Sequence, residues 1–237
     1  MSPHQQPGVR NRLLKALTPD DFALLQPHLQ LMTTELHQRL IAPNTAIEQV
    51  FFPEIGFGSI TTHGFDKKVE VGIVGREGLI GAAPILLGAD RTPLDMFVQA
   101  AGEMLSITTE ALCAAVDQSA SLHRLLLRSI HVQFLQTAQT AFVNATLTIE
   151  ARLARWLLMC HDRLDGDDLH ITHEFLSMML GVQRSSTTLG IQVLEGHRLI
   201  RARRGRITIL DRETLEAMTD GGYGTPEAEF ARLIEGA

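Results

Sequence analysis

The sequence has little cysteine and no long hydrophobic run. Its two cysteines among 237 residues, Cys113 and Cys160, lie far apart and form no CxxC pair. Such spacing gives no sign of a disulfide framework, an iron–sulfur cluster or a cysteine-based zinc site. No run of about 18 apolar residues is present to span a membrane, and the N-terminal stretch lacks the apolar core of a secretory signal. We therefore expect a soluble, cytoplasmic protein with no membrane partner.

A general excess of basic charge is absent too, as are catalytic signatures. The formal net charge is −6 at pH 7, so any contact with nucleic acid must come from a local surface. No GxSxG elbow surrounds the serines at 185 and 186. The stretch CHDRLDGDDLHITH (160–173) matches neither the zinc nor the calcium-loop spacing and is better interpreted as a hydrated hinge. His123 and His131 leave haem ligation open, but packed or solvated histidines are the simpler interpretation. We expect no enzyme, no catalytic residue, no metal and no cofactor.

From about Met32 to Ile107 short apolar runs alternate with turn residues. The runs include IEQVFFP, FGSITTH, VEVGIVG and DMFVQAAG. Several strands at close spacing predict an antiparallel barrel or sandwich. Glycines at every third position of VGIVGREGLIG (71–81) would suit a phosphate-cradling loop, but no long helix follows, which favours jelly-roll turns. Upstream, Thr18-Pro19-Asp20-Asp21 is typical of a helix start.

Between Thr109 and about His161 the sequence has neither proline nor glycine and keeps helical spacing. We expect one long helix, or two helices with a break near 144–148. Apolar residues cover more than one stripe of this helix, including Leu122, Leu126 and Ile130. An apolar surface that wide needs two partners. One is the strand-rich domain, and the other is the same helix in a second subunit.

The segment after the hinge has the pattern of a winged helix-turn-helix. A short strand near 169–171 precedes a helix that ends at Leu180, and a turn at 181–183 leads into a second helix over 184–195. The hairpin LIRARRGRITIL follows with Gly205 at its tip, and Asp211 caps a last helix over 212–218. In this motif the second helix enters the DNA major groove by its N-terminal end.

Four hydroxyl residues in succession, Ser185 to Thr188, open the second helix. Serine and threonine are mediocre helix formers, but their hydroxyls reach phosphates and base edges. Helical spacing turns Thr187, Ile191 and Leu194 inward, toward the preceding helix, with Gly190 beside them at a close helix approach. The side chains left outward are Gln183, Arg184, Ser185, Thr188 and Gln192.

Charge is concentrated in the same segment. Residues 184–206 contain six arginines and one acid, Glu195, so the segment carries +5 and leaves −11 on the rest of the chain. A basic island on an acidic protein is typical of a localised phosphate-binding surface. Taken singly, the hydroxyl cluster is equally an N-cap and the arginines a solvated face. Together with the turn and the hairpin they favour DNA binding.

The run ITHEFLSMMLGVQRSSTTLGIQVLEGHRLI (171–200) resembles, without gaps, the helix-turn-helix of the CRP/FNR family of bacterial transcription regulators. VFFPEIGFGSI and VGREGLIGAAPILLG resemble the family's cyclic-nucleotide-binding-like β-roll, and NATLTIEARLARWLLMC resembles the end of its dimerisation helix. The resemblance spans about residues 11–218, is strong in the helix-turn-helix and looser in the β-roll.

The resemblance implies particular roles for particular residues. Arg184 occupies the position of a guanine-reading arginine, whereas Leu189 stands where the family has a second arginine. In the sensor, Ala82 falls where cyclic-AMP binders place a glutamate on the ribose, and Arg91-Thr92 is at best a remnant of their phosphate-gripping pair. The oxygen-sensing N-terminal cysteines of the FNR type are absent. The DNA-binding residues expected are Gln183, Arg184, Ser185, Ser186, Thr188, Leu189, Gln192, Arg203 and Arg204, and those of an effector pocket are Gly78, Ile80, Gly81, Ala82, Arg91 and Thr92.

The fold class predicted is α+β. It comprises a jelly-roll or β-roll sensor with N-terminal helices (11–108), a long dimerisation helix (109–161), a winged helix-turn-helix (166–220) and a C-terminal tail (221–237). The function expected is a sequence-specific transcription regulator that binds a near-palindromic double-stranded operator as a homodimer through 120–147. RNA polymerase and an unknown small-molecule effector, other than cyclic AMP, are its further partners. The alternative is a signalling or interaction module with a degenerate nucleotide-binding fold that binds no DNA.

Overall fold

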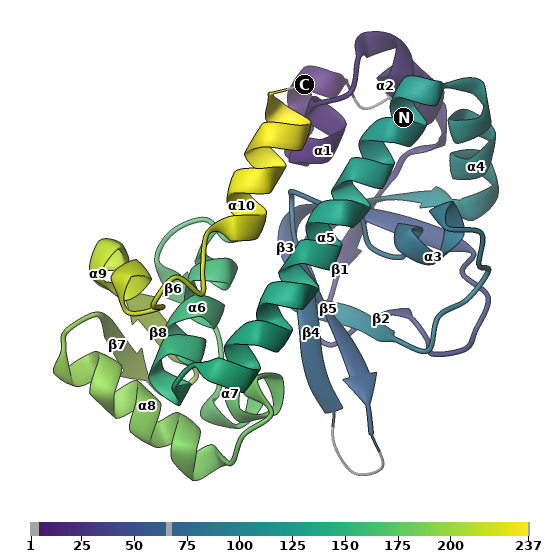
Figure 1. Ribbon diagram of the computed structural model, residues 1–237. Coiled ribbons are helices and arrows are strands. Elements are labelled where there is room, and N and C mark those ends of the chain that lie inside the picture. Colours follow the sequence, from purple (N-terminus) through teal and green to yellow (C-terminus); the bar gives the residue numbers. More distant parts are fainter. Residues whose placement is uncertain (1–4, 65–67, 237) are drawn as a thin grey trace. The chain divides into compact units, whose positions relative to one another are not determined.

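The structure is a computed structural model that describes residues 5–64 and 68–236 (Figure 1). The chain divides into two compact units. The first takes the described residues up to Ile60, those from Ile73 to Phe134 and those from Glu227 on, and the second takes Thr61–Gly72 and Leu135–Pro226. Among the described helices, none combines the length and the apolar character that a membrane crossing requires.

A five-stranded sheet forms the body of the first unit. Its strands follow the order β1-β5-β3-β4, and β2 pairs with β5 as well. β1 runs antiparallel to β5, with Met32 opposite Met104, and β2 is also antiparallel to β5. The expected α+β class with an N-terminal strand-rich domain is confirmed. The strand bounds are β1 Gln30–Thr34, β2 Arg39–Ile41, β3 Gln49–His63, β4 Lys68–Val74 and β5 Asp95–Thr108.

Short helices close one end of this sheet. The predicted start at Thr18 is confirmed, because its hydroxyl accepts a hydrogen bond from the Asp21 amide at 3.2 Å. Asn11 is fully buried, and its side chain donates to the Pro53 and Gly78 carbonyls at 3.1 and 3.0 Å. The N-terminal segment is therefore tied to the sheet by satisfied polar groups. The elements are η1 Gln6–Gly8, α1 Arg12–Lys15, α2 Pro19–Leu25, η2 Gln26–His28 and α3 Ala82–Leu86.

The segment 109–161, expected as one helix or two, contains three. They are α4 Thr109–Gln118, α5 Ala120–Thr146 and α6 Ile149–His161. The first break follows from Ser119, whose backbone is extended and whose hydroxyl accepts from the Leu122 amide at 3.1 Å. The second falls at 147–148, within the range 144–148 that was predicted, and the Thr148 hydroxyl caps α6 by accepting from the Ala151 amide at 3.4 Å. Both breaks are made by hydroxyl caps, so neither proline nor glycine was needed.

The domain bounds expected from the sequence also need correction. The division between the units falls within α5, after Phe134, and α6 belongs to the second unit. Leu122 and Leu126 are fully buried in the first unit, whereas every residue from Leu153 to Cys160 is buried in the second. The helical segment is therefore shared between the two cores instead of forming a separate domain.

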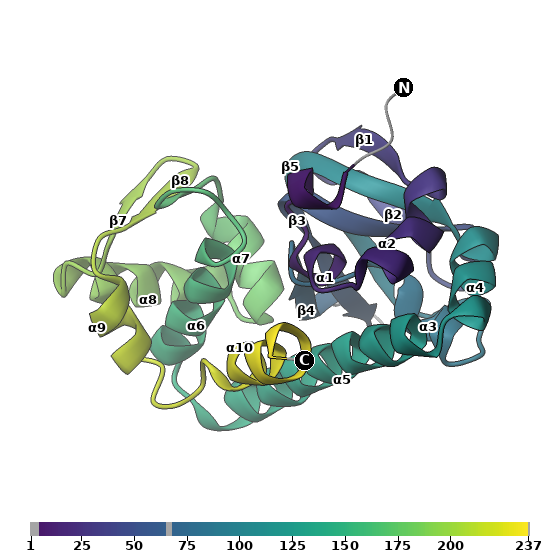
Figure 2. The same cartoon turned by 90° about the horizontal axis from the view of Figure 1, so that it is seen from above.

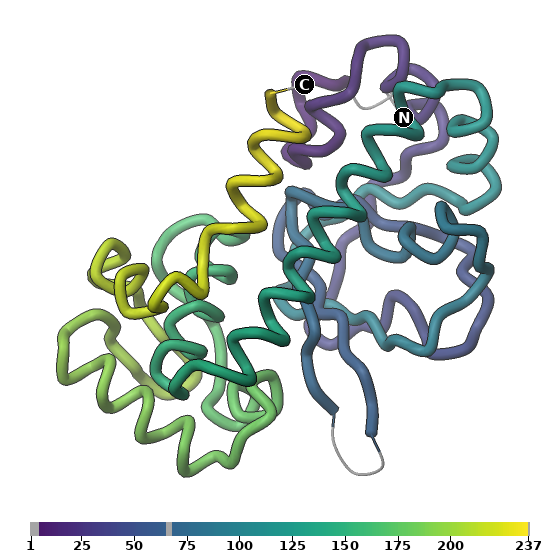
Figure 3. Tube along the Cα trace, viewed as in Figure 1, coloured from purple at the N-terminus to yellow at the C-terminus, as the bar shows by residue number. Residues whose placement is uncertain are grey.

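The expected C-terminal tail is helical. It contains α10 Thr225–Phe230 and η3 Ala231–Glu235, and from Glu227 on it belongs to the first unit (Figure 3). Arg12 holds it through an ion pair with Glu235 at 2.6 Å and by stacking its guanidinium on the Phe230 ring, 4.6 Å from the centroid. The chain thus passes between the units four times, after Ile60, after Gly72, within α5 and after Pro226.

The second unit is mainly helical and carries a small sheet in the order β6-β8-β7 (Figure 2). The ends of β3 and β4 belong to it as well. Trp156 of α6 donates its indole N–H to the buried Glu70 carboxylate of β4 at 2.5 Å, which fixes that strand to the helix. The elements beyond α6 are β6 Asp168–Leu169, α7 His173–Leu180, α8 Arg184–Gly196, β7 Ile200–Arg203, β8 Arg206–Ile209 and α9 Arg212–Ala217.

Candidate nucleic-acid interface

Two helices and a tight turn form the centre of the candidate site. Thr172 caps α7 by accepting from the Phe175 amide at 3.2 Å. Gly181 ends α7 with a φ of 65°, and the amides of Gly181 and Val182 donate back to the Met178 and Ser177 carbonyls. A left-handed residue after a helix is most readily glycine. α8 then begins at Arg184 with Gln183 as its N-cap, so the sequence sets both the angle and the start of the second helix.

The inward face of α8 is the one expected from helical spacing. Thr187, Ile191 and Leu194 are buried, and α8 packs against both α7 and α6. A Cβ atom on Gly190 would lie 3.4 Å from Ile149 and 3.5 Å from Leu153, both on α6. The close approach at Gly190 therefore faces α6, not the preceding helix as spacing alone suggested. α6 is the platform that holds α8.

The outward face of α8 carries most of the residues selected from the sequence. Gln183, Arg184, Ser185, Leu189 and Gln192 are exposed, while Ser186 and Thr188 are half-buried. The Thr188 hydroxyl donates to the Arg184 carbonyl at 2.9 Å, so part of its capacity is used within the helix. The first-turn amides of a helix lack intrahelical acceptors and give this end a partial positive charge. The exposed end of α8 therefore offers hydrogen-bond donors and positive potential together.

The hairpin β7–β8 presents two further arginines. Arg203 and Arg204 are exposed at its tip, where Gly205 has a φ of 72°. Glu195, the single acid of 184–206, accepts the Ala202 amide at 2.7 Å and so joins the hairpin to α8. Arg206 pairs with Asp168 at 3.3 Å, and the pKa of Asp168 is lowered first by the Thr208 hydroxyl and further by Arg206. Within residues 5–64 and 68–236, no ion pair is formed by Arg184, Arg198, Arg201, Arg203 or Arg204.

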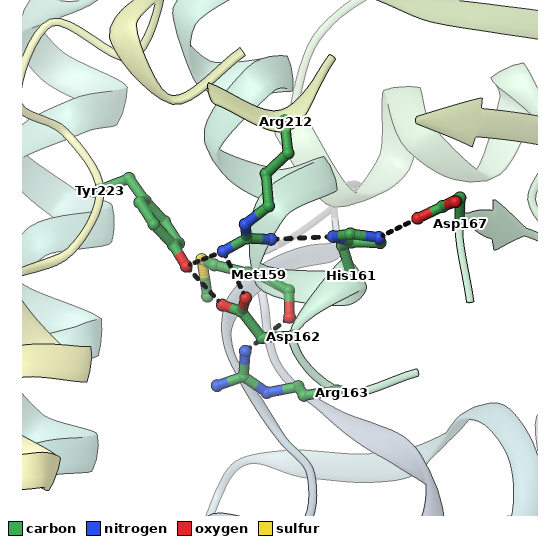
Figure 4. A network of polar contacts seen from close by, with 7 residues as sticks. All are labelled: Met159, His161, Asp162, Arg163, Asp167, Arg212 and Tyr223. Carbon is green, nitrogen blue, oxygen red and sulfur yellow. Dashed lines mark hydrogen bonds and ion pairs between the residues drawn. The ribbon is translucent and has the colours of Figure 1, made fainter. Parts of the chain in front are cut away.

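A polar network fixes the C-terminal end of α6 to Arg212 and Tyr223 (Figure 4). Arg212 donates to Asp162 and to the Tyr223 hydroxyl, each at 2.7 Å, and Tyr223 donates to the second Asp162 oxygen at 2.7 Å. His161 contacts Arg212 through Nδ1 at 2.8 Å and Asp167 through Nε2 at 2.9 Å. Sequence reasoning missed this network, because its members lie up to 61 residues apart. The segment 160–173, interpreted from the sequence as a hydrated hinge, is thus hydrogen-bonded to Arg212 and Tyr223. No group of three potential metal ligands occurs in the described chain.

The six residues expected in an effector pocket differ in their burial and in their hydrogen-bond partners. Ile80 and Ala82 are buried in the sheet unit, and Gly78 and Gly81 shape turns next to them. Thr92 is also buried, and its hydroxyl accepts the Leu94 amide at 3.2 Å. Arg91 is exposed and donates two hydrogen bonds to Asp90, at 3.0 and 2.8 Å. The Asp90 carboxylate raises the pKa of Arg91 and offsets its positive charge.

A different part of the first unit is hollow. A cavity of about 250 Å³ contains none of the six expected effector residues. It is lined by Gln5, Gly8, Val9, Arg10, Leu31, Glu54, Glu103 and Leu105.

Comparisons with known proteins agree with this arrangement. A sequence model of the Crp-like helix-turn-helix domain matches residues 151–218. No curated protein sequence matches the chain. Among solved structures, a putative CRP/FNR-family transcriptional regulator of Eubacterium rectale has a TM-score of 0.69 at 16% identity, over 88% of this chain and 98% of that one. The c-di-GMP responsive global regulator CLP of Xanthomonas campestris gives 0.64 at 17% over 81% and 99%.

A third structure, a putative cAMP-binding regulatory protein of Silicibacter pomeroyi, gives a TM-score of 0.62 at 12% identity over 91% and 99%. At these identities the structures show a common fold. Together with the matched domain, they show that the chain has a Crp-like helix-turn-helix domain within a fold like that of solved CRP/FNR-family regulators. The matched segment begins inside α6, consistent with α6 belonging to the unit of the helix-turn-helix.

The two glycines of the motif provide a test of this packing. Gly190→Ala should stabilise the protein by about 0.5–1 kcal/mol, because alanine is the better helix residue and its Cβ would make ordinary contacts with α6. Gly181→Ala should destabilise it by about 1–2 kcal/mol, since alanine disfavours a positive φ. Urea unfolding followed by circular dichroism measures both. Equal effects of the two changes would contradict the assigned geometry.

Proposed function

We propose that the protein is a sequence-specific DNA-binding transcription regulator that acts as a homodimer on a near-palindromic operator. The observation that carries the proposal is the exposed face of α8 and of the β7–β8 tip, where Arg184, Arg203 and Arg204 form no ion pair within the described residues. Six arginines against one acid in residues 184–206 of an otherwise acidic chain favour a polyanion as the ligand of this segment. Such a regulator would act in the cytoplasm, without catalysis, and RNA polymerase is its proposed protein partner.

The geometry suggests separate roles for the two arginine positions. Arg184 stands at the N-terminal end of α8, which enters the major groove in this motif, and a guanidinium there can bond guanine O6 and N7 together. Ser185 and Gln192 lie on the same exposed face with shorter polar groups. Arg203 and Arg204 at the hairpin tip suit phosphates, which fix register but carry no sequence information.

Alanine variants should separate these roles. Arg184→Ala should cost about 1–3 kcal/mol per guanine contact and relax specificity at one base in each half-site. Arg203→Ala and Arg204→Ala should weaken binding to all sequences alike and reduce the salt dependence. The measurement is binding to a selected operator and to random DNA over a series of salt concentrations. Lys15→Ala, which removes an exposed charge outside the interface, is the control. If Arg184→Ala lowers both affinities equally, its proposed role is wrong.

A second copy of the chain is the proposed partner of α5. Leu127, Phe134 and Phe142 are exposed on this helix at spacings of seven and eight residues, which places them along one stripe. Residues 134–148 carry no charged side chain. An uncharged apolar stripe on a long helix suits a self-complementary contact about a two-fold axis, and such a dimer matches a near-palindromic operator.

Phe134→Glu should convert the dimer to a monomer and weaken operator binding, because it places charge on a side chain that is 65% exposed along this stripe. Leu126, although apolar, is the wrong position for this test because it is fully buried in the first unit. Leu87→Glu is a matched control, since Leu87 is 68% exposed but lies outside α5. Sedimentation at micromolar concentration measures the oligomeric state of the wild type and of both variants. A wild-type monomer would refute the dimer.

The effector is proposed to be something other than a cyclic nucleotide. A buried phosphate and ribose need charged and polar partners, but Ala82 has no polar side-chain atom and Arg91 is paired with Asp90. Loss of one charged hydrogen bond costs about 1.5–3 kcal/mol, or roughly one to two decades in affinity.

Cyclic AMP and cyclic GMP should therefore bind no better than about millimolar and leave operator affinity unchanged. Titration calorimetry, combined with operator binding in the presence of each nucleotide, checks this. A micromolar dissociation constant accompanied by tighter operator binding would refute the proposal.

A further inference from the structure

The outward face of α8 contains an apolar pair within the arginine-rich segment 184–206. Leu189 is 61% exposed and Val193 38% exposed. They are four residues apart, so they lie on one face of the helix, one turn after another. Single exposed leucines are common on protein surfaces. This pair differs because it lies on the face of α8 that also exposes Ser185, one turn before Leu189, and Gln192, two of the residues expected to contact DNA.

The surroundings of the pair favour DNA over a protein as its occupant. Arg184 precedes it on α8, Arg203 and Arg204 lie on the hairpin that follows, and Glu195, the one acid of 184–206, is already bonded to the Ala202 amide. An exposed apolar side chain in an arginine-rich segment complements a polyanion that also offers an apolar group. In the major groove, the C5 methyl of thymine is that group, whereas the other base edges present hydrogen-bond donors and acceptors.

We propose that Leu189, with Val193 beside it, forms a subsite for the C5 methyl of one thymine in each half-site of the operator. Leucine forms no hydrogen bond, so it gains nothing from a guanine or an adenine edge there. The same methyl occurs on 5-methylcytosine, so the subsite should accept that base in preference to cytosine. This inference rests on the proposed DNA-binding function and adds a specificity-determining residue to it.

The experiment starts from an operator selected from random DNA. Each thymine of the operator is replaced in turn by deoxyuridine, which lacks only the C5 methyl, in both half-sites. Burial of one methyl group corresponds to about fourfold in affinity, and two half-sites to about fifteenfold. We expect that loss at one symmetric thymine with the wild-type protein and no loss there with Leu189→Ala. At the same position, 5-methylcytosine should bind more tightly than cytosine by a similar factor.

Leu210→Ala is the matched control, because Leu210 is a leucine of the same unit that is 45% exposed and lies outside α8. It should keep full sensitivity to deoxyuridine. Circular dichroism confirms that both variants fold. The inference is overturned if no thymine is sensitive, or if Leu189→Ala keeps the sensitivity, while selection still yields an operator and the proposed function stands. Failure of selection, with no salt-dependent DNA binding, would overturn the proposed function and this inference together.

Discussion

The packing of α6 is the constraint on which the second unit depends. Every residue from Leu153 to Cys160 is buried, so this helix has no free face along that stretch. α8 approaches it at Gly190, α9 packs on it as well, and Trp156 bonds the buried Glu70 carboxylate of β4. A buried carboxylate is tolerable only when it is hydrogen-bonded. The orientation of α8 is therefore set by α6, a helix that does not itself belong to the candidate interface.

The strand ends that belong to this unit connect α6 to the turn of the motif. Glu70 bonds α6, and the neighbouring Val69 lies within 3.6 Å of the position that a Cβ atom on Gly181 would take. Arg152 of α6 donates to the Leu180 carbonyl at the end of α7. Burial lowers the pKa of Arg152, so this contact is made by a partly desolvated charge. The start of β4 therefore contacts both α6 and the turn between α7 and α8.

The sequence was informative where structure is decided locally. The helix start at Thr18, the turn at Gly181 and the hairpin tip at Gly205 depend on residues within a few positions, and the structure has all three. The break at 147–148 lies in the predicted range, but the one at Ser119 was not predicted, since a hydroxyl cap interrupts a helix without proline or glycine. The bonds of Arg212 to Asp162 and of Arg12 to Glu235 join segments 50 and 223 residues apart. No periodicity encodes such pairings, so neither they nor the docked C-terminal helix were predicted.

The four hydroxyl residues at the start of α8 differ in their exposure and in their hydrogen bonding. Ser185 is exposed, Ser186 is half-buried, and Thr188 is bonded to the Arg184 carbonyl. Thr187 is fully buried, and its hydroxyl has no hydrogen-bond partner within the described residues. Its methyl therefore serves the contact with the core, at the cost of an unsatisfied polar atom. Only part of the hydroxyl cluster is therefore available to contact DNA under the proposed function. Arg184, Ser185 and Gln192 remain for hydrogen bonding, and Leu189 for apolar contact, so the proposed readout combines few polar contacts with shape and methyl recognition.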